Sequence, residues 1–376
     1  MSDYFLADDL SGALDAAAAF HRVGRRVTVA LSPREWPDCG NSDVVGITTE
    51  TRNSTASAAA ECVLAAVRAA RERGARLIYK KIDSTLRGPV AAELAALAIA
   101  MPQTRFLFAP ANPSVGRIVR AGNLLVHGVP VAETEFAHDP MSPVRQSSIP
   151  LLLGEAAGPQ VTIADAETEA DLAAAVGRME SLGEPWVAIG SGALARPVAA
   201  LHPGASPATR NAHSVPARGP IIFVCGSAHK GNRAQAQELA RECGVPVRTV
   251  TPADIDAVTR TAIADVARHG AVSLIVDTEP IDSANALQSI AAVASAVALE
   301  TRTTSVFATG GETAFAVCRA LGVSCVTFQE EIEPGVSLAL SEGATGTMYW
   351  VVKPGGFGDP HTWSHAMRAL RRCYFI

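Results

Sequence analysis

The clearest indication of the fold class lies in residues 77–109, which read LIYKKIDSTLRGPVAAELAALAIAMPQTRFLFA. Leu77–Ile82 and Phe106–Ala109 are short, mainly apolar runs that predict strands. Val90–Ala100, between them, is rich in Ala and Leu and predicts a helix. Apolar strands that alternate with helices indicate a parallel sheet covered by helices on both of its faces.

The same alternation extends in both directions from this stretch. Toward the N-terminus, strands are predicted at Val27–Leu31 and Val44–Thr48, with helices at Ala13–Arg22 and Ser57–Arg73. Beyond residue 220 a helix is predicted near Asn232–Cys243, and further helices are predicted between the later strands. The strands predicted in that half are Ile221–Cys225, Val247–Val250, Val272–Asp277, Ser305–Ala308 and Ser324–Phe328.

The alternation breaks between Gly190 and Pro220, where Ala, Pro, Gly, Ser and Arg dominate. Such a composition predicts a linker or a surface excursion. A chain of 376 residues is also long enough for two domains of roughly 150–200 residues each. We therefore expect two doubly wound α/β domains with mainly parallel sheets, one spanning residues 1–215 and the other residues 216–376.

Composition excludes several classes of protein. Hydrophobic residues make up 48% of the chain and charged residues 18%, which argues against a disordered protein. The formal net charge of -5 gives no reason to expect nucleic acid as a partner. The seven cysteines contain no closely spaced pair, the N-terminus has no leader pattern, and no apolar stretch is long enough for a membrane span. A cytoplasmic protein is the expectation.

Polar side chains follow four of the N-terminal strands. They occur in Ala7–Ala13, Thr48–Arg52, Lys80–Gly88 and Ala109–Arg117. Ligands of open α/β sheets bind beyond the carboxyl ends of the strands. Arginine and lysine suit a carboxylate, while Asp83 and the nearby hydroxyls suit a polyol. The alternative is that these residues only cap helices or form solvated strand ends.

Glycine-rich turns mark the C-terminal half. Cys225–Gly231 and Thr309–Thr313 each follow a strand and open a helix, and Lys353–Asp359 lies near the end of the chain. Glycines at a helix start let backbone N–H groups approach phosphate oxygens. The alternative is three simple turns. Neither a Walker A motif nor the Gly-x-Gly-x-x-Gly fingerprint occurs, which disfavours a P-loop NTPase and a standard dinucleotide fold.

Taken together, these motifs resemble those of the four-carbon acid sugar kinases. The resemblance covers nearly the whole chain and rests on Ala7–Ala13, Lys80–Gly88, Ala109–Arg117, Val126–Gly128, Thr134–Phe136, Asp139–Pro140, Gly310–Thr313, Glu333–Val336 and Lys353–Gly358. It implies an N-terminal domain that binds a sugar acid, a C-terminal domain that binds ATP, and an active site in the cleft between them. Family members phosphorylate threonate, erythronate or 3-oxo-tetronate at the terminal C4 hydroxyl.

The resemblance also suggests which residues bind each ligand. On the substrate side it implies Asp9, Arg52, Lys81, Asp83 and Ser84, to which the strand-end pattern adds Lys80 and Arg87. On the nucleotide side it implies Ser227, Gly310, Gly311, Glu312, Thr313 and Gly356, to which the last glycine turn adds Gly355. The Lys-Ile-Asp-Ser-Thr-Leu-Arg-Gly form at residues 81–88 is similar to the threonate and erythronate type.

The expected reaction is phosphoryl transfer from ATP, with Mg²⁺ bridging its phosphates. Arg52 and one lysine of the Lys80–Lys81 pair are expected to hold the carboxylate of the substrate. Asp83 is the first candidate for orienting or deprotonating the C4 hydroxyl, and Asp9 is the second. The sequence does not identify the ligands of the metal. It leaves open a homodimer, a 3-oxo-tetronate 4-kinase, a nucleotide-dependent sugar-acid dehydrogenase and a non-catalytic sugar-acid-binding protein.

Overall fold

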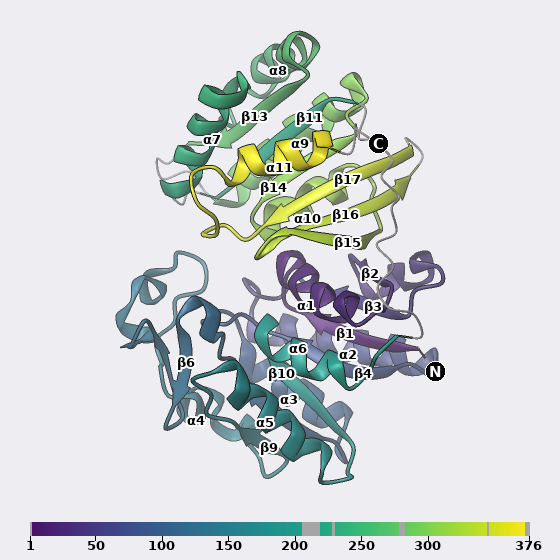
Figure 1. Ribbon diagram of the computed structural model, residues 1–376, viewed down its shortest axis with the longest axis vertical. Coiled ribbons are helices and arrows are strands. Elements are labelled where there is room, and N and C mark those ends of the chain that lie inside the picture. The colour runs from purple at the N-terminus through teal and green to yellow at the C-terminus, as the bar shows by residue number, and fades with distance from the viewer. Residues whose placement is uncertain (1, 205–218, 228–229, 278–282, 344–345, 373–376) are drawn as a thin grey trace. The chain divides into compact units, whose positions relative to one another are not determined.

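The computed structural model describes residues 2–204, 219–227, 230–277, 283–343 and 346–372. The chain divides into two compact units, Met1–Ala208 and Thr209–Ile376, here called unit 1 and unit 2. Each is an α/β domain, as predicted, and Figure 1 shows helices on both faces of its sheet. The predicted boundary at residue 215 lies outside the described residues, so domain limits of 1–215 and 216–376 stay a prediction.

Unit 1 is built on a sheet with the strand order β2-β3-β1-β4-β10-β5-β9, in which neighbouring strands are parallel. The strands are β1 (Asp3–Ala7), β2 (Val27–Ala30), β3 (Val44–Thr48), β4 (Arg76–Lys81), β5 (Arg105–Ala109), β9 (Val161–Ile163) and β10 (Trp186–Gly190). The chain winds outward from β1 first toward β2 and then toward β4. This reversal is the topological switch point of a doubly wound sheet, where such folds bind their ligands.

Helices cover both faces of the sheet of unit 1. On one face α1 (Leu10–Arg22) packs on α6 (Gly192–Ala200), which in turn packs on α5 (Glu169–Glu180). On the other face α2 (Ala56–Glu72) packs on α3 (Val90–Ala100), with α4 (Ile149–Leu153) beside α3. A separate antiparallel sheet of β6 (Arg117–Arg120), β7 (Asn123–Val126) and β8 (Val129–Pro130) was not predicted.

The predicted linker between Gly190 and Pro220 is wrong for its first part. Residues 192–200 form α6, which the Ser191 side chain caps by accepting a hydrogen bond from the Ala193 N–H. Leu194 and Val198 are buried in unit 1, and this burial compensates for the backbone hydrogen bond that Pro197 cannot donate. A composition rich in Pro and Gly therefore did not prevent a helix here.

Unit 2 has the strand order β12-β13-β11-β14-β17-β16-β15. Its strands are β11 (Ile221–Cys225), β12 (Val247–Val250), β13 (Ala271–Val276), β14 (Ser305–Thr309), β15 (Cys325–Glu333), β16 (Val336–Gly343) and β17 (Gly346–Lys353). Neighbours from β12 to β17 are parallel, whereas β17, β16 and β15 are joined by antiparallel pairing. The strand predicted at Ser324–Phe328 is the start of β15, and its antiparallel partners were not predicted.

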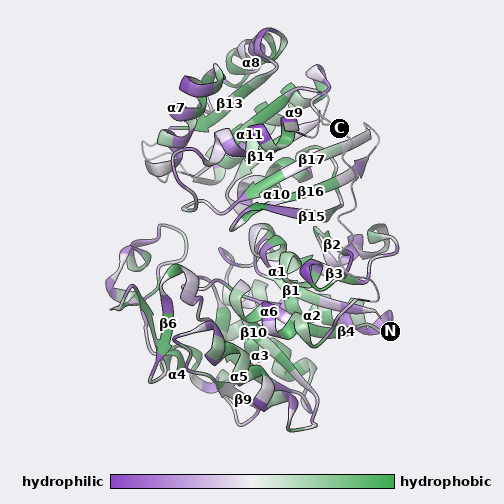
Figure 2. Cartoon of the chain, in the orientation of Figure 1, coloured by the Kyte–Doolittle hydropathy of each residue, from purple (hydrophilic) through white to green (hydrophobic). Residues whose placement is uncertain are grey.

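The helices of unit 2 pack in two groups. On one side α9 (Ser283–Thr301) packs against both α8 (Ile255–His269) and α10 (Gly311–Ala320), and on the other α7 (Lys230–Cys243) packs on α11 (Thr362–Arg372). Phe223, Phe307 and Trp363 form an aromatic centre between the sheet and α11, with ring centroids 5.3–5.6 Å apart. Figure 2 shows hydrophobic colouring along the central strands of both units.

Candidate active site

Three of the four polar stretches predicted at N-terminal strand ends follow neighbouring strands of unit 1, whereas the fourth, Ala109–Arg117, follows β5, which β10 separates from β4. Asp8 and Asp9 follow β1, Arg52 follows β3 by four residues, and Asp83 follows β4 by two. Since β3, β1 and β4 are adjacent and parallel, their carboxyl ends meet at one edge of the sheet, at the switch point. The expected convergence of these residues is therefore present in the fold.

Arg52 is held between two aspartates. Its Nε and Nη2 atoms donate to Asp8 at 2.8 and 3.0 Å, and its Nη1 and Nη2 atoms donate to Asp9 at 2.8 and 2.7 Å. These bonds use four of its five N–H groups, which leaves one on Nη1. Although burial opposes the effect, the charges of Arg52 and Lys81 keep the pKa of Asp9 below its ordinary value.

Asp9 also caps helix α1. One of its carboxylate oxygens accepts from the Gly12 N–H at 2.7 Å and the other from the Ser11 hydroxyl at 2.6 Å. The capping role that the sequence offered as an alternative is thus real. It coexists with the ion pair to Arg52, so Asp9 is a rigid, ionised group at the sheet edge.

Asp83 lies in a second, similar network. Its carboxylate accepts from the Thr85 N–H and hydroxyl and, in two-pronged fashion, from Arg87 Nε at 3.0 Å and Nη2 at 2.9 Å. Arg87 also donates to Asp139 at 3.2 Å. Burial favours the neutral acid, but the charges of Arg87 and Arg52 hold the pKa of Asp83 well below its usual range. Asp83 is therefore ionised at neutral pH, mainly because of these arginines.

Lys80 and Lys81 point to opposite faces of the sheet, because side chains alternate along a strand. The Lys80 ammonium is fully buried and pairs with Glu93 of α3 at 3.0 Å, and Glu93 also accepts from the Thr51 hydroxyl at 2.5 Å. Lys81 instead donates to the Ile82 carbonyl at 3.1 Å and lies 3.9 Å from Asp15. The structure thus favours a packing role for Lys80. It leaves Lys81 as the lysine beside the carboxyl ends of β3, β1 and β4.

Two residues near this edge were not among the predicted site residues. Arg117 donates to the Ser84 hydroxyl at 2.5 Å, and its guanidinium lies 5.6 Å from the ring centre of Phe136. Arg87 approaches the same ring at 5.7 Å. The signal for Arg117 was present in the sequence, since it ends the Ala109–Arg117 stretch that follows β5.

Glu50 is the second residue that was missed. It has a left-handed backbone with φ of +49°, a conformation that a non-glycine residue rarely adopts. Its carboxyl accepts a hydrogen bond from the Thr48 hydroxyl at 2.5 Å. Burial and the neighbouring charges of Asp9 and Asp8 raise the pKa of Glu50 well above its ordinary value. Its neutral form is thus favoured, the opposite of the shift at Asp9.

A cavity of about 340 Å³ lies within unit 1 beside Arg52. Gly88 lines it, and a β-carbon on that glycine would lie 2.9 Å from the Arg52 carbonyl oxygen. The other lining residues are Ser54, Leu86, Pro89, Ser142, Pro143, Val144, Arg145, Gln146 and Leu152. Because neither Asp9 nor Asp83 lines this cavity, it adjoins the polar cluster rather than containing it.

The three glycine turns of unit 2 lie side by side. They follow β11, β14 and β17, which are neighbours in the sheet, and Cys225, Thr309 and Lys353 at the ends of these strands are in register. The turns also touch one another. A β-carbon on Gly226 would lie 2.6 Å from Thr313 Oγ1, and one on Gly355 would lie 3.0 Å from Ser227 Oγ.

The predicted nucleotide residues are thereby brought to one edge of the sheet of unit 2. Gly310 is the N-cap of α10, with φ of +99°, and Gly311, Glu312 and Thr313 form the first turn of this helix. Unpaired N–H groups at a helix start favour anions such as phosphate. Ser227 and Gly355 lie beside this turn, and Gly356 continues the loop after β17.

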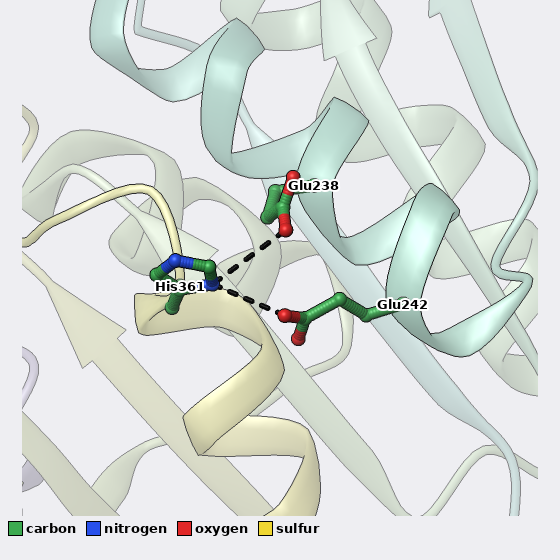
Figure 3. A group of neighbouring side chains, drawn as sticks. All are labelled: Glu238, Glu242 and His361. Atoms are coloured by element: carbon green, nitrogen blue, oxygen red, sulfur yellow. Dashed lines mark hydrogen bonds and ion pairs between the residues drawn. The ribbon is translucent and has the colours of Figure 1, made fainter.

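Within the described residues, one group of side chains has the spacing of a metal site. Glu238 and Glu242 of α7 converge on His361, whose Nδ1 lies 3.6 and 3.1 Å from their carboxylates (Figure 3). Arg241 and Arg368 pair with the same glutamates, so their negative charge is already compensated. We interpret the group as an ion-pair network that joins α7 to α11. In the described ranges, no helix combines the length and apolar character needed to cross a membrane.

Comparisons with known proteins agree with this arrangement. Residues 4–161 match the family model described as a sugar-binding N-terminal domain, and residues 222–363 match the nucleotide-binding C-terminal domain. D-threonate kinase of Bordetella bronchiseptica is 32% identical over 98% of both chains. 3-Oxo-tetronate kinase of Cupriavidus necator is 28% identical over 97% of this chain and 96% of its own.

A solved structure from Salmonella typhimurium, described as a putative tRNA synthase, superposes with a TM-score of 0.78. It covers 98% of this chain and 99% of its own, and at 22% identity it supports the fold alone. The two family models, arranged in this order, and the full-length relatives establish the membership that the motifs indicated. The chain belongs to the four-carbon acid sugar kinase family.

Proposed function

We propose that the protein is an ATP-dependent kinase that phosphorylates a four-carbon sugar acid at its terminal C4 hydroxyl. The observation that carries the proposal is the presence of two complementary sheet edges in one chain. One bears ionised aspartates with arginines and a lysine, and the other bears three glycine turns in register. The first chemistry suits a hydroxylated carboxylate, and the second suits phosphate.

The first candidate substrate is a threonate or erythronate. The relative named D-threonate kinase is 32% identical over nearly its whole length, whereas that named 3-oxo-tetronate kinase is 28% identical. The second candidate, a 3-oxo-tetronate, rests on this latter relative. We assign residues 1–215 to sugar-acid binding and residues 216–376 to nucleotide binding, in line with the descriptions of the two family models.

The substrate carboxylate is assigned to Lys81 and to the remaining N–H group of Arg52, with Ser84 and Arg87 nearby. Lys80 takes no part in this assignment because Glu93 neutralises it in the protein interior. Asp9 holds Arg52 in place and keeps its guanidinium oriented.

Asp83 is assigned to accept a hydrogen bond from the C4 hydroxyl of the substrate. An ionised carboxylate with a low pKa accepts a hydrogen bond well but is a weak proton acceptor. Phosphoryl transfer through a loose transition state demands more in positioning than in proton removal. We therefore propose that Asp83 mainly orients the hydroxyl, with Asp9 as the second candidate.

ATP is assigned to Ser227, the start of α10 at Gly310–Thr313, and Gly355 and Gly356. The Glu238–Glu242–His361 group is compensated by arginines, so we propose that Mg²⁺ enters bound to the phosphates of ATP. The metal would there neutralise charge on the phosphate oxygens. A cytoplasmic location, where ATP is abundant, stays a prediction.

The test is a coupled assay of ADP release with purified protein. Stereoisomers of threonate, erythronate and 3-oxo-tetronate are supplied one at a time with ATP and Mg²⁺. ADP is expected only when all three components are present, with the highest kcat/KM for a threonate or erythronate. If no four-carbon acid elicits ADP, the kinase assignment is wrong. A parallel absorbance assay with NAD(H) tests the dehydrogenase alternative, and calorimetric binding without turnover would indicate a non-catalytic protein.

A further inference from the structure

Lys353 ends β17 and is completely buried, although its side chain carries a charge in its ordinary state. It stands in register with Thr309 at the end of β14, directly before the glycine turn of residues 354–358. A lysine beside a glycine-rich phosphate loop is usually expected to reach the phosphates. The environment of its ammonium group indicates a different use.

Four oxygen atoms surround Lys353 Nζ. The carbonyls of Phe357, Pro354 and Gly355 lie at 2.7, 3.2 and 3.3 Å, and Asn232 Oδ1 of α7 lies at 3.1 Å. Among the described residues no carboxylate lies within ion-pair distance of this ammonium. Burial lowers the pKa of Lys353 to about 8, so the group is still mostly protonated at neutral pH. The loop after β17 therefore directs three of its carbonyl groups at the Lys353 ammonium.

This arrangement determines where the backbone N–H groups of the turn point. In a trans peptide the C=O and N–H bonds point in opposite directions, and the described residues contain no cis peptide bond. Three carbonyls directed at Nζ require the N–H groups of Gly355, Gly356 and Gly358 to point away from it. Within the described residues none of these three N–H groups donates a hydrogen bond.

A concave run of unpaired N–H groups is a binding site for an anion. Gly355 lies against Ser227 and so places this run beside the other glycine turns. Gln235 of α7 also donates to the Phe357 carbonyl at 3.2 Å, which strengthens the attachment of the loop to that helix. The loop is thus shaped before any ligand arrives.

We propose that Lys353 is a positioning residue for the nucleotide: it holds residues 354–358 so that the N–H groups of Gly355, Gly356 and Gly358 face the phosphates, and it does not itself contact ATP. The inference rests on the proposed kinase function, because it takes the ligand of this edge to be the phosphate chain of ATP. Four protein oxygens within 3.3 Å occupy the three N–H donors of the ammonium, and the side chain is completely buried, so no donor is left for a ligand.

The test compares Lys353→Met with the wild type. Methionine has a similar length but cannot donate, so the carbonyls lose their common partner. We expect the dissociation constant of ATP, measured by calorimetry, to rise roughly 10- to 100-fold, as for the loss of one or two hydrogen bonds to a charged ligand. Adenosine, which has no phosphate, should bind with unchanged affinity. In kinetics, KM for ATP should rise more than kcat falls, with KM for the sugar acid unchanged.

A second measurement separates positioning from direct contact. Chymotrypsin is added to nucleotide-free protein, and cleavage after Phe357 is followed by mass spectrometry. Loss of the lysine should speed this cleavage, because the loop is no longer held. If ATP affinity falls but cleavage stays as slow as in the wild type, Lys353 contacts the phosphates and the positioning role is overturned. Unchanged ATP affinity in a folded variant overturns it as well.

Asn232→Leu covers the case in which Lys353→Met does not fold. It removes one of the four oxygens and keeps the ammonium, so a smaller loss of ATP affinity in the same direction is expected. If Asn232→Leu keeps its full affinity for ATP although chymotrypsin cleaves it faster after Phe357, the inference is overturned and the proposed function is left intact. A wild-type protein that binds no ATP would instead contradict the proposed function, and the inference with it.

Discussion

Asp83 and Asp9 show how one residue type is adapted by its neighbours. Asp83 pairs with Arg87 and Asp9 pairs with Arg52. Each carboxylate has a lowered pKa despite its burial. Glu50, only a few residues from Arg52, has a raised pKa because it is buried and because it lies beside Asp9 and Asp8. The edge thus combines two carboxylates that are held in their charged form with one carboxyl group that is shifted toward its neutral form.

Asp83→Asn is expected to lower turnover by roughly 10²–10⁴-fold, the range for a residue that handles the reacting proton or hydroxyl. KM for the sugar acid should change far less, since other groups bind its carboxylate. Asp139→Asn is the matched control, because it removes the other aspartate that Arg87 contacts. If the role of Asp83 is only to pair with Arg87, both variants should lower the melting temperature and neither should lower turnover. Near-normal turnover in folded Asp83→Asn would transfer the role to Asp9.

Glu50→Gln is expected to change how stability depends on pH. Above the ordinary pKa of 4.5, the unfolded state loses the proton of Glu50 while the folded state keeps it. The wild type therefore loses stability as pH rises toward the folded-state pKa. Glutamine does not titrate, so the variant should gain free energy of unfolding relative to the wild type between pH 4.5 and neutral pH. Urea titrations at several pH values measure the difference in free energy of unfolding between the variant and the wild type. A difference that does not change with pH would contradict the raised pKa.

At the scale of elements, the start of α10 is the strongest candidate for phosphate binding. The helix opens directly after β14, Gly310 supplies a backbone with φ of +99°, and Gly226 lets the neighbouring turn approach Thr313. A helix N-terminus attracts anions through its unpaired N–H groups and its dipole. The α7–α11 network of Glu238, Glu242 and His361 lies on other elements and contributes to packing within unit 2.

Gly311→Val is expected to raise the dissociation constant of ATP by about tenfold or more, because a branched side chain obstructs the approach of a phosphate. Binding of the sugar acid should be unaffected. Gly177→Val is the control, since Gly177 lies within α5 of unit 1 and nothing lies within 4 Å of its added β-carbon. Calorimetric titration of both variants gives the answer. Equal ATP affinity in Gly311→Val and wild type would remove this turn from the site.

At the scale of the whole molecule, each unit carries one of the two chemistries on its own sheet. Both sheets follow the doubly wound pattern, and in both the polar residues gather at the carboxyl ends of the strands beside the switch point. A ligand that binds only the folded protein stabilises it by mass action. The sugar acid should therefore stabilise the protein through unit 1, and ATP should stabilise it through unit 2.

Threonate and ATP are each expected to raise the melting temperature of the wild type. Lys81→Met should abolish the shift caused by threonate and keep the shift caused by ATP, because Lys81 lies at the edge of unit 1. Gly311→Val should show the opposite pattern. Differential scanning fluorimetry at saturating ligand measures both. A Lys81→Met protein that loses the ATP shift would contradict the assignment of the two ligands to separate units.

The sequence by itself determined the local elements and the chemistry they carry. Val44–Thr48, Val90–Ala100 and Ile221–Cys225 form as predicted, since periodicity and helix-end signals act within a few residues. The motifs also placed Asp9, Arg52 and Asp83 at strand ends. Their convergence followed from the general rule that the carboxyl ends of parallel strands share an edge.

Only the tertiary structure decided which of these side chains is available to a ligand. Lys80 and Lys81 are alike in sequence, but Lys80 meets Glu93 of a helix packed on its face of the sheet, whereas Lys81 does not. The Lys353 ammonium is likewise engaged by a distant partner, since it donates to Asn232, which lies 121 residues away in the chain. Such partners depend on strand order and helix packing, which bring distant residues together and leave no trace in local periodicity. For the same reason the strands β16 and β17, the antiparallel pairing of β15 with β16, and the helix α6 emerged only from the fold.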